Sequence, residues 1–565
     1  MRLVQPAPMA VSATPAPRRP PPAPAVGAGR IAIAVAGLLL IGAYVSMQHV
    51  SARSSPVWDE MQFWGIGYYY WHYGRFNIPG SILHPPLSYY LNSLPLMART
   101  IPPELFHPDI PDLYVADTNR GNHLLYMFGF DTFLASRTPF IVAYCLAGVV
   151  VFCWARRWWG NGGGLLSLAL YLLCPTLMAN GYLMTTDALV AAVGLAALWG
   201  VVESLEHPSA WALLLLVGGL ALAPAAKITG LLLNLLVAAC VVGRLFLPAP
   251  AVYVPGRGVR PVSRTQFLLY WTVIGAACAV ITWWTLTLFY SGDWRLELFR
   301  TTIVRTRAYV ERGQAIFLDG RKSVHGFPEY YAKALLYKLP PATIVALAAA
   351  LAVPTTATRR RACLAVGLAA AVVTYFSFSR YTLGLRYVLL ALPLLHVAAG
   401  RLLATGPRSR ARRIGALALV AAVALDVGAF YPYTRAYVDR LVVRGPGWTV
   451  LSDVDMDWGE GLVALHDYVK QHHLGPIALS YHGSAQPVLF GIETSWLHDH
   501  YLFPPVTGVR PTGGLLFVSA TNLSAVYMHG NPYGWLRDRP PVAVVGGTIY
   551  VYDLDAIPPA ERWRQ

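Results

Sequence analysis

Two adjacent carboxylates, Asp59 and Glu60, follow the first long apolar segment of the chain, which covers residues 31–50. An aromatic stretch at residues 63–73 comes next, and it is followed by His84 with two prolines behind it. Neighbouring residues of a helix point about 100 degrees apart, so one acid would face a substrate and the other the scaffold. Such a carboxylate can be a general base. It can also be a solvated loop acid beside a helix N-terminus, where negative charge is favourable.

Three cations, Lys227, Lys338 and Arg386, lie at the ends of later apolar segments. Cations at a membrane face can bind a phosphate group, although each alone can also be an anchor whose charge reaches the lipid headgroups. Asp187 begins another apolar segment, where it can cap the helix or take part in chemistry. His84 is a further candidate for a substrate contact, but its two following prolines also fit a role in shaping a rigid loop.

One carboxylate with several cations would suit the transfer of a sugar from a polyprenyl-phosphate carrier. The departing phosphate needs little help from a general acid, so a single base that deprotonates the incoming hydroxyl or amine is enough. The cations would stabilise the phosphate as it leaves. We therefore predict catalytic residues Asp59 and Glu60, with substrate contacts from His84, Asp187, Lys227, Lys338 and Arg386.

The segments that carry these residues require a membrane. Of the 565 residues, 56% are hydrophobic and only 13% are charged, which exceeds what the core of a soluble protein needs. A membrane-spanning helix takes about 20 mostly apolar residues. Eleven spans are predicted, at residues 31–50, 133–155, 162–180, 185–203, 210–226, 228–247, 266–289, 335–355, 362–379, 387–404 and 414–431.

The formal charge of +16 comes largely from arginines at every second junction between spans. This pattern is the positive-inside rule, so the basicity reports topology and argues against nucleic-acid binding. It places the N-terminus in the cytoplasm and, with eleven crossings, the C-terminus outside. The inward-facing arginines are Arg18, Arg19, Arg30, Arg156, Arg157, Arg257, Arg260, Arg264, Arg359, Arg360, Arg361 and those at 408–413.

Residues 1–30 are predicted to be a disordered cytoplasmic tail, because they are rich in proline, alanine and arginine and cannot bury a core. Residues 31–431 would form the transmembrane domain. Its loops 51–132 and 290–334 would share the outer face with a C-terminal domain at 432–565. Ionisable groups gathered at one membrane face are costly unless they are used, so we expect function there.

The C-terminal segment is predicted to be a small α/β domain, since strand and helix patterns alternate. The expected strands are near 448–451, 477–481, 514–520 and 542–552, with a helix at 462–472.

The acidic run from Asp453 to Glu460 superficially resembles a calcium loop. Its glycine is one position late, and Ala464 stands where a bidentate acid belongs, so we favour a turn that caps the next helix. Asp59, Glu60 and His84 could together bind a divalent ion, but we predict neither a metal site nor a cofactor. All six cysteines fall within or beside apolar segments, so no disulfide framework is implied.

In this order, the motifs resemble the GT-C glycosyltransferases of family 39, which include the protein O-mannosyltransferases and the aminoarabinose transferase of lipid A. The C-terminal segment is similar to that of a bacterial branch of the family. The Thr185-Thr186-Asp187 segment departs from the Thr-Pro-Asp of many relatives. The matching motifs are the Asp59-Glu60 pair, Gly74-Arg75-Phe76, His84 to Leu87, Thr186 to Leu189, Lys227 to Gly230, Phe327 to Tyr331, Lys338 to Pro340, Arg386-Tyr387, Asp453 to Gly459, Tyr481 to Ala485 and Ser519 to Leu523.

The resemblance implies a multi-pass protein of the bacterial inner membrane with a periplasmic C-terminal domain. It implies inverting transfer from a polyprenyl-phosphate sugar to a protein, lipid or glycan acceptor, with Asp59 as base or acceptor-binding acid. Arg386 would bind the carrier phosphate, and Tyr387 beside it would be a further substrate contact.

Two other functions remain open from the sequence. A transporter or flippase of lipid-linked sugars also carries charges near its spans, although transporters commonly show repeats with ionisable groups near the midplane. The charges here collect at one face, which favours surface chemistry. The other alternative is a non-catalytic member of the family that serves as a binding scaffold.

Overall fold

The computed structural model describes residues 26–74, 76, 83–106, 113–247, 250–354, 356–404, 410–498 and 506–563. Of the tail predicted at 1–30, residues 1–25 lie outside this range, and residues 26–30 belong to the first helix. Arg75 of the predicted Gly-Arg-Phe turn also lies outside it.

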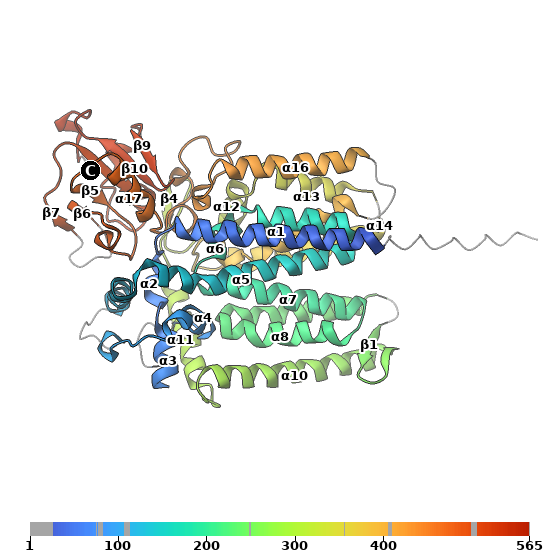
Figure 1. The fold of residues 1–565 in the computed structure, drawn as a ribbon. Helices are drawn as coiled ribbons and strands as arrows, with labels where there is room; N and C mark the ends of the chain where they lie inside the picture. The colour runs from blue at the N-terminus through green and yellow to red at the C-terminus, as the bar shows by residue number, and fades with distance from the viewer. Residues whose placement is uncertain are drawn as a thin grey trace, which may run out of the picture.

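Long helices run side by side and form the body of the molecule (Figure 1). This arrangement follows from the apolar segments, whose backbone groups are all satisfied within a helix. The helices of the body are α1 (Val26–Ala52), α5 (Leu113–Leu172), α6 (Pro175–Gly181), α7 (Thr186–Glu206), α8 (Ala210–Ala226), α9 (Leu233–Arg244), α10 (Arg264–Phe289), α12 (Tyr330–Lys338), α13 (Pro341–Ala352), α14 (Thr356–Ser377), α15 (Ala391–Ala399) and α16 (Arg410–Gly428).

Five of these helices are long and apolar enough to cross a membrane, and a sixth is counted if the bent pair α12–α13 is one span. The predicted count of eleven crossings is therefore not confirmed. Three more of the predicted spans coincide with shorter apolar segments at Ala210–Ala226, Ile228–Arg244 and Ala391–Leu403. The chain is nonetheless a polytopic helical membrane protein, as predicted.

Two breaks in the helical body have identifiable causes. Within α5, Gly160 adopts φ 79°, a left-handed backbone that side-chain-bearing residues avoid. It falls between the spans predicted at 133–155 and 162–180. The pair α12–α13 bends by 108° at Pro340 and Pro341, because proline lacks the N–H that a continuous helix needs.

Short helices and the C-terminal sheet gather at one end of the body, and the β1–β2 hairpin lies at the other end (Figure 1). The arginine-rich junction near Arg257 and Arg260 is part of that hairpin. The predicted outer loops and this arginine-rich junction thus lie at opposite ends of the molecule. The short elements are α2 (Trp58–Phe63), α3 (Ile66–Tyr73), α4 (Leu87–Ser93), α11 (Glu297–Arg312), β1 (Ala251–Val254), β2 (Gly258–Pro261), β3 (Ile316–Leu318) and β4 (Arg321–Ser323).

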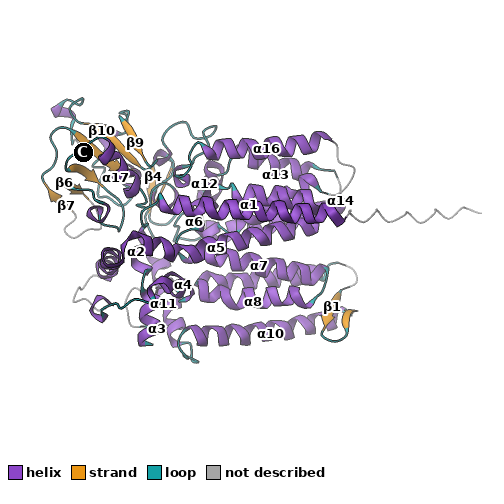
Figure 2. Ribbon diagram, in the orientation of Figure 1, coloured by secondary structure: helices purple, strands orange, loops and turns teal. Residues whose placement is uncertain are grey.

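The C-terminal segment contains a six-stranded sheet in the order β7-β6-β5-β8-β10-β9 (Figure 2). The central strand β5 pairs in parallel with both β6 and β8, and the outer pairs are antiparallel. The predicted α/β character is confirmed. The elements are α17 (Leu462–Gln471), β5 (Ile477–Ser480), β6 (Thr494–His498), β7 (Val506–Gly508), β8 (Leu515–Ser519), α18 (Ala520–Ser524), β9 (Ala543–Val545) and β10 (Ile549–Asp553).

Two predicted strands were wrong. The run near 448–451 begins with the 3₁₀ turn Gly447–Thr449, which Pro446 introduces. The run 542–552 is two strands, because Gly546 and Gly547, with φ of 59° and 73°, turn the chain between β9 and β10. Both strands are short apolar runs, and the Gly-Gly pair between them was the turn signal that the prediction overlooked.

The loop that was predicted at 51–132 and the C-terminal sheet share one hydrophobic core. Met61 and Trp64 of the loop belong to the same buried cluster as Leu465, Ile477 and Phe517 of the sheet region. Burial of this shared apolar surface fixes the sheet against α2, the helix that carries Asp59.

Candidate active site

Asp59 and Arg386, far apart in sequence, form an ion pair with Oδ2 and Nη1 2.6 Å apart. Asp59 lies in the first turn of α2, and Arg386 lies in the 3₁₀ turn η5 (Leu385–Val388). Their side chains are only 17% and 8% exposed. A charge-assisted hydrogen bond in such a poorly hydrated place is stronger than one at the surface.

A second carboxylate extends this pair into a row of alternating charges. Nη1 of Arg386 lies 3.9 Å from Oδ2 of Asp187, the second residue of α7. The other oxygen of Asp187 accepts a hydrogen bond from Nζ of Lys227, the residue directly after the end of α8. The row therefore runs from Asp59 through Arg386 and Asp187 to Lys227. It contains two positive and two negative groups drawn from four parts of the chain.

Tyr387 and His84 border this row. The ammonium of Lys227 stands 4.2 Å from the ring centroid of Tyr387, in the range of a cation–π contact. Burial, and after it the charge of Lys227, lowers the pKa of His84 to about 3, so this imidazole is neutral at ordinary pH. A neutral imidazole can accept or donate a hydrogen bond without adding charge to the row.

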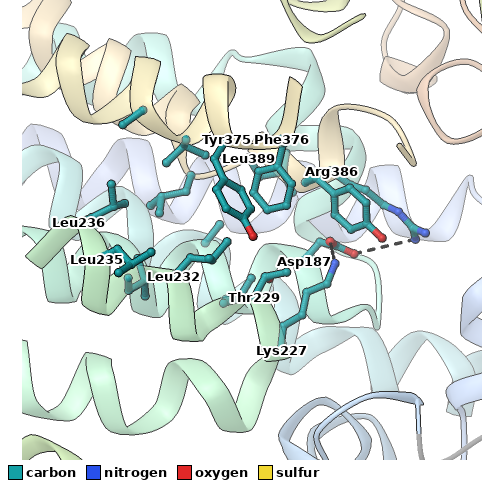
Figure 3. A pocket seen from close by; sticks show the side chains of 17 residues that line it. Asp187, Lys227, Thr229, Leu232, Leu235, Leu236, Tyr375, Phe376, Arg386 and Leu389 are labelled. Carbon is teal, nitrogen blue, oxygen red and sulfur yellow. Dashed lines mark hydrogen bonds and ion pairs between the residues drawn. The ribbon is translucent and has the colours of Figure 1, made fainter. Parts of the chain in front are cut away.

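The charged row closes one end of a largely apolar cavity of about 160 Å³ (Figure 3). Asp187, Lys227 and Arg386 stand at that end, and Leu235 and Leu236 lie at the other. Side chains of α7, α9 and α14 form the walls, and Tyr375 points its hydroxyl into the space (Figure 3). The shape suits a ligand with a long apolar tail and an anionic head.

Glu60 occupies a different environment from its neighbour Asp59. Both of its oxygens accept hydrogen bonds from Arg137, at 2.9 and 2.6 Å, and they also accept the backbone N–H groups of Met184 and Val57. Both side chains of this ion pair are fully buried. The structure thus directs the two acids to different partners. It gives no support to Glu60 as a catalytic residue or as a metal ligand with Asp59 and His84, because its acceptor sites are used.

The structure also gives no support to the predicted contact of Lys338 with the carrier phosphate. Its ammonium donates a hydrogen bond to the carbonyl of Arg435 at 2.7 Å and lies 3.4 Å from the sulfur of Met456. It does not line the cavity beside Arg386. Lys338 thus contacts the C-terminal segment, two residues before the bend of the helix pair at Pro340.

Two residues near the site were missed by the sequence reasoning. Arg137 lies inside a predicted apolar span, and a lone arginine there was itself a signal for a buried partner. Trp458 packs its ring against Arg386, with the guanidinium carbon 4.6 Å from the ring centroid. Its position in an acidic turn gave no sign of this contact.

Burial raises the pKa of Asp59, while the charge and hydrogen bond of Arg386 oppose that shift. The carboxylates of Asp187 and Asp453 add to the rise. A carboxylate whose pKa is raised is a stronger base than an ordinary aspartate. Among the described residues, no group of three or more His, Cys, Asp or Glu side chains is arranged to hold a metal ion.

Residues 122–256 match a glycosyltransferase family model. Its description is "Dolichyl-phosphate-mannose-protein mannosyltransferase", and the matched stretch, which includes Asp187 and Lys227, is less than a quarter of the chain. The resemblance to a family that includes the protein O-mannosyltransferases is thus borne out over these residues. No curated protein matches the sequence.

Two solved structures resemble the fold. The structure of ArnT from Cupriavidus metallidurans bound to undecaprenyl phosphate is 16% identical, with a TM-score of 0.49, and the alignment covers 96% of this chain and 100% of that chain. The apo structure of the same protein is also 16% identical, with a TM-score of 0.47 and coverage of 95% and 99%.

Proposed function

We propose that this chain is an integral-membrane glycosyltransferase that moves a sugar from a polyprenyl-phosphate donor to an acceptor, with inversion at the anomeric carbon. The observation that carries the proposal is the apolar cavity that ends at Lys227 and Arg386. Arg386 in turn forms an ion pair with Asp59. The family match over residues 122–256 supports the same class of reaction.

In this proposal the isoprenoid lies in the apolar cavity between α7, α9 and α14. Its phosphate lies against Arg386 and Lys227, since a guanidinium and an ammonium are the side chains best suited to a phosphate. The phosphate would compete with Asp59 for Arg386. Donor binding would then release the carboxylate from its ion pair and leave it free to accept a proton.

The reaction needs only one base. The hydroxyl or amine of the acceptor would lose its proton to Asp59 while its oxygen or nitrogen forms a bond to the anomeric carbon of the sugar. The bond from that carbon to the phosphate oxygen breaks, and its electron pair goes to the phosphate. Asp59 loses a negative charge as the phosphate gains one, so the total charge of the site stays constant through the step. A single displacement of this kind inverts the anomeric centre.

The end of the molecule that carries the C-terminal sheet would face the periplasm, as the arginine-rich β1–β2 hairpin at the opposite end favours the cytoplasm. The acceptor would reach Asp59 from that side. Glu60 would hold α2 in place through Arg137.

The test is to incubate the purified protein in detergent with radiolabelled polyprenyl-phosphate sugars and a panel of protein, lipid and glycan acceptors. We expect one donor to be consumed and its sugar to appear on one acceptor with the opposite anomeric configuration. Arg386→Ala should weaken binding of the donor about 100-fold, because charged hydrogen bonds of this kind are worth a few kcal/mol. Unchanged donor binding by Arg386→Ala would remove this residue from the phosphate site.

A further inference from the structure

The acidic turn Asp453–Glu460 of the C-terminal segment contacts Arg386 and the residue immediately before Asp59. From the sequence, this turn was predicted to cap the next helix, although it superficially resembles a calcium loop. In the structure Asp455 is directed toward the backbone before Arg386, whereas Asp453 and Asp457 are directed toward the segment that follows β8. The turn therefore connects the sheet to the site.

On the Arg386 side, the turn holds the backbone just before the arginine. Asp455 accepts the backbone N–H of Leu385 on both carboxylate oxygens, at 3.0 and 3.2 Å, and accepts the hydroxyl of Tyr330 at 2.7 Å. Gly384 has φ 69°, and a Cβ there would lie 2.2 Å from Val454 and 2.8 Å from Asp455. The approach is therefore so close that only glycine fits.

Trp458 supports the arginine side chain itself. Its ring lies 4.6 Å from the guanidinium carbon of Arg386, and the tryptophan is 3% exposed. A buried cation–π contact of this kind holds the guanidinium plane in one orientation. The backbone just before Arg386 and the side chain of Arg386 are thus both contacted from the same turn.

On the Asp59 side, the same turn holds the start of α2. The carbonyl of Trp458 accepts the N–H of Trp58 at 3.1 Å, and the carbonyl of Glu460 accepts the N–H of Ser55 at 3.0 Å. The hydroxyl of Ser55 donates to the carbonyl of Gly459 at 2.9 Å. Trp458 is therefore bonded to the residue immediately before Asp59.

The turn is anchored to the sheet behind it. Asp457 accepts the backbone N–H of Thr521 at 2.9 Å, and its carbonyl accepts the hydroxyl of Thr521 at 2.7 Å. Asp453 accepts the hydroxyl of Tyr527 at 2.6 Å. Thr521 is the second residue of α18, which directly follows β8, so the sheet supports the turn that contacts the site.

We propose that the turn Asp453–Glu460 sets the distance and orientation between the proposed base and the proposed phosphate ligand. Asp455 and Trp458 are positioning residues in this arrangement, and the C-terminal segment is part of the active site. This inference rests on the function proposed above.

The experiment compares Asp455→Ala, Asp455→Asn and the wild type in two readouts. The first is hydrogen exchange of the peptide that contains residues 384–388, which needs no substrate. The second is the kinetics of sugar transfer. Asp538→Ala, which removes an exposed acid of the same domain, is the matched control.

We expect Asp455→Ala to speed exchange at 384–388 and to lower the transfer rate about 100-fold, the size of effect that a misplacement of about 1 Å produces. Asp455→Asn should stay within about fivefold of the wild type, because its amide can accept from Leu385 and donate to Tyr330. Unchanged exchange and transfer in Asp455→Ala would overturn the proposal. A wild type without transfer, together with faster exchange in Asp455→Ala, would refute the glycosyltransferase function and leave the positioning role standing.

If Asp455→Ala does not fold, Trp458→Leu tests the proposal in its place. It should raise the KM for the donor about fivefold, the size of one cation–π contact, and Trp458→Phe, which keeps an aromatic face, should raise it less. A donor KM equal to that of the wild type in Trp458→Leu would overturn the role assigned to this ring.

Discussion

Two buried arginine–carboxylate pairs begin from neighbouring residues of α2, and they differ in how completely their polar atoms are used. Glu60 accepts four hydrogen bonds, and Arg137 also donates to the carbonyls of Ser51, Ser54 and Ser55. In the described part of the chain, Nε of Arg386 is buried without a hydrogen-bond partner. A saturated buried pair stabilises the fold, whereas a pair with unused capacity beside a cavity can exchange a partner for a ligand.

The sharpest test of this difference is Asp59→Asn. It should lower the rate of sugar transfer about 1,000-fold, because the amide cannot take the proton of the acceptor. Initial rates with the radiolabelled donor measure the effect, and the thermal unfolding temperature serves as the control for folding. Transfer at the wild-type rate would exclude Asp59 as the base.

Glu60→Gln, in contrast, should act mainly on the stability of the protein. It leaves the buried charge of Arg137 without its counter-ion, which costs about 3–5 kcal/mol of stability. Thermal unfolding in detergent measures this loss directly. If Glu60→Gln unfolded at the wild-type temperature and yet transferred no sugar, Glu60 would be needed for the reaction and not for stability. The proposed difference between the two pairs would then be wrong.

The cavity can be tested by filling it. Leu236→Trp places a large ring at the end remote from the charged row, and it should raise the KM for a long-chain donor about tenfold. A donor with a short isoprenoid should be affected much less, because its tail stops before this residue. Leu268→Trp, on the exposed face of α10, is the control, and equal effects of the two substitutions would argue against the cavity as the lipid site.

The smallest expected effect is on the pH dependence of transfer. Asp59 must be ionised to accept a proton, so the rate falls as the pH drops through its pKa. Burial raises that pKa, so the acid limb should lie above the value of about 3.9 for an ordinary aspartate. A pH–rate profile of the wild type measures this limb, and a rate that stays constant down to about pH 4 would contradict the raised pKa.

Several features of the site could be predicted from residue type and place. Asp59, Asp187, Lys227 and Arg386 are ionisable groups at the ends of apolar segments, where burial of a charge is costly unless it is paired. Their order along the chain did not say which acid would meet which cation. Lys338 carried the same signal as Lys227, and only the structure shows that it bonds to the carbonyl of Arg435 and not to a carboxylate of the row.

The sequence by itself determined the helical membrane body, the elements α17, β5 and β8 of the C-terminal segment, and the four charged residues of the row, because apolar periodicity and isolated charges are local properties. Only the tertiary structure decided that Asp59 pairs with Arg386 while Glu60 pairs with Arg137. It alone also placed the turn Asp453–Glu460 against both sides of the site. These pairings depend on packing between segments far apart in the chain, 77 residues for Glu60 and Arg137 and 327 residues for Asp59 and Arg386. No local pattern encodes such packing.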